Sequence, residues 1–343
     1  MPANNLRLGA FSAALALLAV TSSGALAQKK YDIGATDTEI KIGNIMPYSG
    51  PASAYGVIGK TEAAYFNKIN AEGGINGRKI NFVTYDDGYS PPKTVEQARK
   101  LVESDEVLLI FNSLGTPPNS AIQKYMNQKK VPQLFVATGA TKWNDPKEFP
   151  WTMGWQPNYQ SESQIYAKYM LKNHPNAKIA VLYQNDDYGK DYLKGFKDGL
   201  GAKAASLIVM EESYEVSEPT IDSHIVKLKS TGADVFFNIT TPKFAAQAIK
   251  KNMEIGWRPL HFLNNVSASI GSVMKPAGFE NSQDIISSQY LKDPTDPQWK
   301  NDAGMKAWNE FLDKYYPEAN RADASVMYAY TVAQGLVHVL KAC

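Results

Sequence analysis

The sequence is short of the residues on which disulfides and metal sites depend. Its one cysteine, Cys343, is the last residue, so the chain can form no intrachain disulfide and no cysteine-based zinc site. The four histidines are scattered, and no two are spaced as helical metal ligands are: His174, His224, His261 and His338. We therefore expect no metal site and no cofactor.

The sequence also lacks an excess of either charge. Lys and Arg number 36 against 34 Asp and Glu, without a basic stripe, which argues against nucleic acid as a partner. The sequence contains no Gly-x-Ser-x-Gly elbow and no phosphate-binding loop. The chain is therefore predicted not to be an enzyme, and an extracytoplasmic enzyme is the weaker alternative to a binding protein.

Long apolar runs are missing as well, apart from a short one near the start. Arg7 precedes an apolar run over residues 9–20, and Ala25-Leu26-Ala27 has the small-x-small pattern of a cleavage site. The run is too short to span a bilayer, so residues 1–27 are predicted to be a secretory signal peptide that is cleaved after Ala27. No cysteine follows the apolar run, which excludes a lipid anchor, and the mature protein is expected to be soluble in the periplasm.

Strand and helix patterns alternate along the rest of the chain. Strands are expected at residues 39–46, 79–85, 107–111, 131–137, 178–184, 204–210, 234–238, 259–263 and 284–290. Helices are expected at 57–72, 92–104, from 116 onwards, and at 161–172, 186–200, 219–230, 242–253, 298–315 and 322–341. This alternation predicts an α/β fold with parallel sheets covered by helices. Residues 143–159, rich in Trp and Pro, are expected to cross between two lobes, and residues 264–272 to cross back.

One strand-to-helix turn suggests where a ligand binds. The apolar strand 107–111 leads to Gly115, then to Thr116 as a helix cap and Pro117 at the first helical position. A helix that starts at the carboxyl end of a strand presents free N–H groups and the positive end of its dipole, which suits a carboxylate. A plain helix cap is the alternative. A similar turn, Thr240-Thr241-Pro242, occurs in the second half.

Several spaced stretches together resemble the type I periplasmic solute-binding proteins of ABC importers, in the branched-chain amino acid (Leu/Ile/Val) receptor group. They are Ile-Gly-Asn-Ile-Met-Pro-Tyr-Ser-Gly-Pro at 42–51 with Tyr55-Gly56, Ile-Asn-Ala-Glu-Gly-Gly-Ile-Asn-Gly-Arg at 69–78, Tyr-Asp-Asp at 85–87 and Asn-Asp-Asp-Tyr-Gly-Lys at 185–190. The resemblance implies two Rossmann-like lobes with parallel central sheets joined by a hinge. Residues 28–150 and 272–343 would form the first lobe, and residues 151–271 the second, with the hinge crossings.

The resemblance also implies partners and a departure in length. The chain would act as a monomer that delivers a small carboxylate ligand to ABC permease subunits in the membrane. Members of the group usually continue past a helix such as 322–340 into a third hinge crossing. Either the sequence is truncated after Cys343, or that crossing is absent.

The resemblance further implies a set of ligand-binding residues. In this group a hydroxyl at a helix start and the turn after the next strand bind the ligand carboxylate, while two aromatic residues form walls. Carried over position by position, the predicted ligand-binding residues are Tyr55, Leu114, Gly115, Thr116, Ala137, Thr138, Gly139, Tyr188, Thr241 and Val266.

Val266 stands where the group has the carboxylate that binds the ligand ammonium, and no Asp or Glu lies between Trp257 and Lys275. An unpaired buried ammonium costs several kcal/mol, so the sequence favours an acid without an α-amino group. Tyr55, Tyr188 and the aromatic residues of 151–159 suggest an aromatic acid such as a benzoate or cinnamate, although the tryptophans could simply pack the hinge. The alternatives are a receptor for branched-chain or other amino acids and a ligand sensor that acts through a separate membrane protein.

Overall fold

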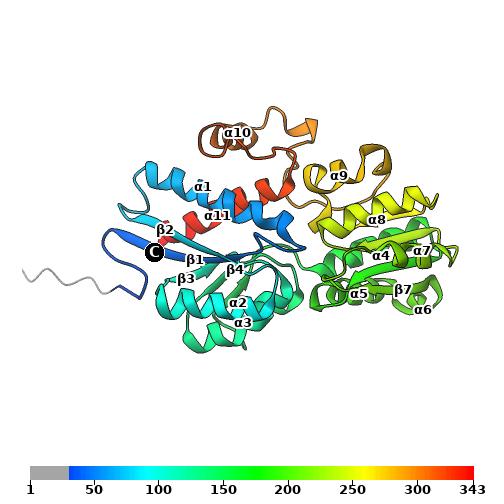
Figure 1. Ribbon diagram of the computed structural model, residues 1–343, viewed down its shortest axis with the longest axis horizontal. Helices are drawn as coiled ribbons and strands as arrows, with labels where there is room; N and C mark the ends of the chain where they lie inside the picture. The colour runs from blue at the N-terminus through cyan, green and yellow to red at the C-terminus, as the bar shows by residue number, and fades with distance from the viewer. Residues whose placement is uncertain (1–30) are drawn as a thin grey trace, which may run out of the picture. The chain divides into compact units, whose positions relative to one another are not determined.

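Two parallel β-sheets organise the part of the chain that this computed structural model describes, residues 31–343 (Figure 1). Residues 32–343 form one unit, in which strands and helices alternate. The predicted α/β fold with two parallel-sheet lobes is therefore confirmed. The predicted signal peptide, residues 1–27, lies outside the described residues.

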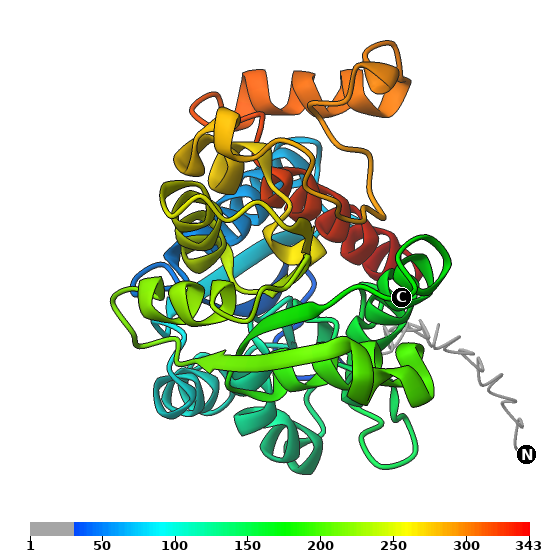
Figure 2. The same cartoon turned by 90° about the vertical axis from the view of Figure 1, so that its right-hand side faces the viewer.

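The first sheet has the strand order β2-β1-β3-β4-β5, with every neighbouring pair parallel. Its strands are β1 (Glu39–Met46), β2 (Lys79–Asp86), β3 (Leu109–Phe111), β4 (Gln133–Val136) and β5 (Thr152–Gly154). One face is covered by α1 (Gly56–Ala71) and α11 (Ala324–Ala342), with α10 (Ala303–Tyr315) packed over them, and the other by α2 (Pro91–Arg99) and α3 (Thr116–Lys129). Both views show α11 beside α1 (Figures 1 and 2). Because side chains alternate along a strand, Ile42 of β1 joins the core under α1 while Ile45 joins the core under α2 and α3.

The second sheet has the order β7-β6-β8-β9 and is also parallel. Its strands are β6 (Ile179–Gln184), β7 (Ile208–Tyr214), β8 (Val235–Ile239) and β9 (Leu260–Leu263). One face is covered by α4 (Tyr159–Asn173) and α5 (Asp187–Leu200), the other by α7 (Asp222–Lys229) and α8 (Pro242–Glu254). Val181 of β6 faces the first pair of helices and Leu182 the second pair.

The segment expected to cross between the lobes, residues 143–159, contains a strand of the first sheet. β5 pairs with β4 through Gln133 and Thr152, so only residues 155–158 lie between the first sheet and α4. The structure thus differs from the predicted division, which gives residues 151–154 to the second lobe. A three-residue edge strand with Met153 exposed shows too little alternation to be recognised in a sequence.

A second difference lies after β9. Residues 270–277, which include α9 (Lys275–Ala277), pack against α8 through Val273, Met274 and Ala277, and Ile286 forms a single parallel bridge with Phe262 of β9. The chain therefore stays with the second sheet to residue 286, whereas the sequence suggested a return at 272. The strand expected at 284–290 is this one bridge.

A smaller difference concerns residues 204–210. They begin with the helical turn α6 (Ala204–Leu207), and β7 starts only at Ile208, because Ala, Ser and Leu favour the helical turn.

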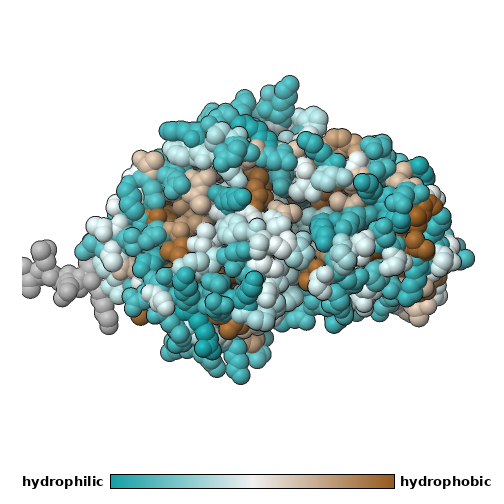
Figure 3. Space-filling view, in the orientation of Figure 1, coloured by the Kyte–Doolittle hydropathy of each residue, from teal (hydrophilic) through white to brown (hydrophobic). Residues whose placement is uncertain are grey.

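Hydrophilic residues cover most of the face drawn in Figure 3, with apolar residues scattered among them. Within residues 31–343, no helix combines the length and the apolar character that a membrane span requires.

Candidate functional site

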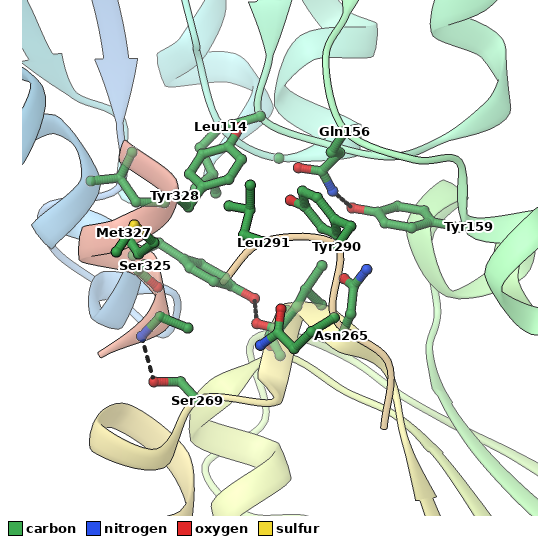
Figure 4. Close-up of a pocket in the computed structure, with 18 of the residues that line it drawn as sticks. Leu114, Gln156, Tyr159, Asn265, Ser269, Tyr290, Leu291, Ser325, Met327 and Tyr328 are labelled. Carbon is green, nitrogen blue, oxygen red and sulfur yellow. Dashed lines mark hydrogen bonds between the residues drawn. The ribbon is translucent and has the colours of Figure 1, made fainter. Parts of the chain in front are cut away.

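A cleft of about 880 Å³, counting its part open to solvent, is lined by residues from both sheets (Figure 4). Many of its lining residues follow the carboxyl ends of β1, β2, β3, β4, β6, β8 and β9. In open α/β sheets this edge is where ligands bind, because the helices that follow the strands begin there. The cleft is therefore the candidate ligand site.

Eight of the ten predicted ligand-binding residues line this cleft: Tyr55, Leu114, Gly115, Thr116, Ala137, Tyr188, Thr241 and Val266. The other two do not. Thr138 is buried behind Thr116, and Gly139 packs against Pro157 and Tyr159, where an added Cβ would lie 2.5 Å from the Pro157 carbonyl.

Two backbone N–H groups in the turn after β4 are already hydrogen-bonded within the protein. The Ala137 N–H donates to Ser113 O at 2.9 Å and the Thr138 N–H to Val136 O at 2.8 Å. The resemblance implies that this turn binds the ligand carboxylate, but the N–H groups of Ala137 and Thr138 are already used within the protein.

Thr116 begins α3 but does not cap it. The N-cap is Gly115, and the Thr116 hydroxyl lies 2.5 Å from the Thr138 hydroxyl. The Thr138 oxygen accepts from Ala140 N and from Trp143 Nε1, both at 3.3 Å, which uses its two lone pairs. Either hydroxyl can donate in the Thr116–Thr138 hydrogen bond; with Thr138 as the donor, the Thr116 proton is free for an acceptor in the cleft.

The start of α3 offers fewer N–H groups than an ordinary helix. Pro117 and Pro118 have none, and the Asn119 N–H donates to Gly115 O at 3.0 Å, so Thr116 alone among the first three residues carries an N–H. Gly115 has φ +101°, and a Cβ there would lie 2.5 Å from Cε2 of Tyr89. Only glycine fits this turn without moving the Tyr89 ring.

Tyrosines form the walls of the cleft from both lobes. The Tyr55 hydroxyl donates to the Val266 carbonyl at 3.0 Å, which links the segment after β1 to the segment after β9. The Tyr188 hydroxyl donates to the Asn264 side-chain oxygen, and the Tyr159 ring meets the Tyr188 ring edge-on at 5.5 Å. Burial raises the pKa of Tyr55 and Tyr188 well above the usual value, so both rings are neutral phenols.

Thr241 also lines the cleft, and its hydroxyl is engaged within the second lobe. It donates to Gln184 Oε1 at 3.2 Å, and its N–H donates to the Tyr214 hydroxyl at 3.2 Å. Thr241 therefore presents its methyl group rather than a free donor.

Charged side chains among the lining residues are already paired. Lys292 Nζ lies 2.6 Å from Asp302 Oδ2, and Asp293 Oδ1 accepts from the N–H and the hydroxyl of Thr295 at 2.7 and 2.6 Å. Among residues 31–343, no group of three or more His, Cys, Asp or Glu side chains is placed to hold a metal ion.

Three carboxylates near the lining also accept hydrogen bonds from their neighbours. Asp186 accepts from Tyr188 N and Gly189 N, and Glu162 from the Tyr166 and Tyr192 hydroxyls and Asn265 N. Asp323 Oδ1 accepts from the hydroxyls of Ser269 and Ser272 and from the Ser325 N–H.

The predicted site residues leave out about two thirds of the lining, 15 of its 23 residues, which include Lys292 and Asp293. Its further members come from the loop after β2, from the two inter-lobe segments and from α11: Tyr89, Gln156, Tyr159, Asn265, Ser269, Gln289, Tyr290, Leu291, Ala324, Ser325, Met327 and Tyr328, with Ile58 of α1. The α11 residues follow the ordinary apolar period of a core helix, so no local signal separates those that face the cleft.

Comparisons with known proteins agree with this architecture. A family model described as periplasmic binding protein matches residues 39–343. The Leu/Ile/Val-binding protein homolog 7 of Brucella abortus (strain 2308) is 25% identical over 304 residues, which cover 84% of this chain and 73% of that protein.

Solved structures show the same fold at low identity. A substrate-binding periplasmic protein from Ralstonia solanacearum has a TM-score of 0.78 and 22% identity, covering 88% of this chain and 84% of that one. A fatty acid ABC transporter substrate-binding protein from Thermomonospora curvata has a TM-score of 0.76 and 23% identity, covering 91% and 78%.

Proposed function

This chain belongs to the periplasmic binding protein family, and from that premise we propose that it is the receptor of an ABC importer for a small aromatic carboxylic acid. Membership of the family makes it an extracytoplasmic solute-binding receptor. The ligand class, the delivery to permease subunits, the monomeric state and the cleavage after Ala27 belong to the proposal.

The observation that carries the ligand class is the lack of a free carboxylate in the cleft. Val266 stands at the position where an ammonium-binding acid is expected, and its carbonyl already accepts from Tyr55. Asp293, the one acidic lining residue, is bonded to Thr295, and the acids behind the lining are each hydrogen-bonded to their own neighbours. An α-ammonium group at the Val266 position would lose its hydration without a carboxylate beside it, which costs several kcal/mol.

The opposite end of the ligand has a donor available. The hydroxyl of Thr116 is 1% exposed and lies 2.5 Å from that of Thr138; with Thr138 as the donor, the Thr116 proton is free for an acceptor in the cleft. A hydrogen bond from a buried hydroxyl to a carboxylate is charge-assisted and stronger than one to a neutral oxygen. Thr116 with its N–H thus supports a carboxylate at the start of α3.

Aromatic rings surround the space between these two ends. Tyr55, Tyr89, Tyr159 and Tyr188 line the cleft, and the Tyr159–Tyr188 pair already has the edge-on geometry that aromatic rings prefer. In an aromatic carboxylic acid, the carboxylate would accept hydrogen bonds from Thr116 and the ring would pack against the tyrosines.

The second candidate is a receptor for a branched-chain or other amino acid. It is favoured by the relatives named Leu/Ile/Val-binding protein homologs, which are 25% identical to this chain. It requires a partner for the ammonium group, and Asp186, Glu162 and Asp323 already accept hydrogen bonds from their own neighbours.

A thermal-shift screen separates the two candidates. Benzoate and cinnamate, aliphatic monocarboxylates, and leucine, isoleucine and valine are tested on the mature chain. A ligand at 100 times its Kd contributes about 2.7 kcal/mol to stability, which shifts the melting temperature measurably. We expect aromatic acids to stabilise most; strongest stabilisation by the branched-chain amino acids would overturn the aromatic-acid proposal.

A further inference from the structure

Residues 287–292 carry the chain from the second sheet back to the first, and they pass through the ligand cleft. At one end, the Ser287 hydroxyl donates to Leu263 O at 2.8 Å, and the Ser288 and Tyr166 hydroxyls are hydrogen-bonded at 2.9 Å. At the other end, Lys292 Nζ donates to Asp302 Oδ2 at 2.6 Å. The crossing is therefore held on both sides, and the residues between its anchors are kept in place.

Three residues between these anchors, Gln289, Tyr290 and Leu291, line the cleft. Figure 4 shows Leu291 between Tyr290 and Tyr328. The ring of Trp155 packs edge-on against both neighbours, with ring centroids 6.3 Å from Tyr290 and 5.5 Å from Tyr328. Tyr328 is fixed in turn, because its hydroxyl accepts from Asn112 Nδ2 at 2.9 Å. The aromatic residues beside Leu291 are thus held by contacts with one another.

The side chains around Leu291 are apolar. Leu114 and Met327 line the same cleft from the first lobe, and Leu291 packs on the core to which both belong. Thr116 is two residues from Leu114 and offers the hydroxyl proposed for the carboxylate. An acid held there places its remaining atoms among these apolar groups, with Leu291 as the part contributed by the crossing.

We propose that Leu291 sets the upper size of the apolar end of the ligand. This inference rests on the proposed function, because it assumes an acid bound at Thr116. Removing three carbons from Leu291 opens space for a longer ligand, and enlarging the side chain closes it. The expected discrimination is that of a hydrophobic pocket, about 10-fold or more for a misfit of a few carbons.

The test uses isothermal titration calorimetry of the mature chain with benzoate and its 4-methyl, 4-ethyl, 4-propyl and 4-butyl derivatives. We expect Leu291→Ala to change the Kd ratio of 4-butylbenzoate to benzoate by at least tenfold in favour of the longer acid, and Leu291→Phe to change it the other way. Leu108→Ala is the matched control, since Leu108 is half-buried against the same core but does not line the cleft; its ratio should equal that of the wild type. The Phe variant keeps the test decisive if the Ala variant fails to fold.

The inference would be overturned if both Leu291 variants changed the Kd of every acid in the series by the same factor, or if neither variant changed any Kd. Either result would leave the proposed acid receptor intact. If no benzoate binds the wild type, the proposed ligand class fails, and the size limit is measured instead with 1-butanol to 1-octanol by NMR shift perturbation. If Leu291→Ala binds a longer alcohol than the wild type does, this result supports the inference on its own. An equal limit, or no alcohol binding, overturns it.

Discussion

Replacing Thr116 by alanine tests the donor end of the site most directly. The Thr116 hydroxyl is buried beside that of Thr138, and we propose that it donates its proton to a ligand carboxylate. A hydrogen bond to a charged group contributes about 1.5–3 kcal/mol, so the Kd for the best acid of the screen should rise about 10- to 150-fold. Isothermal titration calorimetry measures this change directly.

The same variant should also lose stability without ligand. Thr138 would keep its two donors, Ala140 N and Trp143 Nε1, but would lose its hydrogen bond with Thr116. The loss of one hydrogen bond costs about 0.5–1.5 kcal/mol, which urea unfolding of the apo chain measures. Thr116→Ser is the matched control, because it keeps the hydroxyl, and it should restore both affinity and stability. An affinity of Thr116→Ala within twofold of the wild type would refute the reasoning and leave Thr116 a structural residue only.

Three further predictions concern other parts of the cleft. Tyr55→Phe removes the hydrogen bond to Val266 that joins the lobes and should raise the ligand Kd about 2- to 10-fold in the same calorimetry; an unchanged Kd would show that this bond does not favour the closed cleft. Gly115→Ala places a Cβ against Tyr89 at a positive φ and should lower the free energy of unfolding by about 1–3 kcal/mol in urea, and an unaltered midpoint would contradict it. Burial raises the pKa of Asp186 from 3.8 to about 6, so the native state binds a proton between about pH 4 and 6 that the unfolded state lacks, and stability falls as pH rises through that window. Asp186→Asn should flatten this part of the pH profile of urea unfolding, and an undiminished slope there would contradict the assignment.

Much of the fold follows from local patterns in the sequence. The strand at 39–46 and the helices near 57–72 and 186–200 have the expected positions, because alternation, helical period and turn residues are local properties. The ends of the strands then bring Leu114, Ala137, Tyr188 and Thr241 together, since parallel strands end at one edge of a sheet.

The rest depends on contacts that no local pattern contains. Residues 152–154 form the strand β5 because they pair with the edge of β4. Residues 270–277 stay with the second lobe because they pack on an apolar face of α8. The N–H groups of Ala137 and Thr138 looked free from the sequence, yet neighbouring carbonyls use both. Leu291 looked like part of the chain beyond a strand, and only the position of the crossing turns it toward the cleft.

The pair Pro117-Pro118 has a consequence for what the cleft leaves out. A helix start with free N–H groups is a general oxyanion site, which accepts phosphate or sulfate as readily as a carboxylate. Here Thr116 carries the one N–H that the first three residues of α3 offer. Tetrahedral oxyanions, which need several donors arranged around them, should therefore be poor competitors even where they are abundant. If the ligand is the organic acid that we propose, the two prolines therefore favour it over inorganic anions at this helix start.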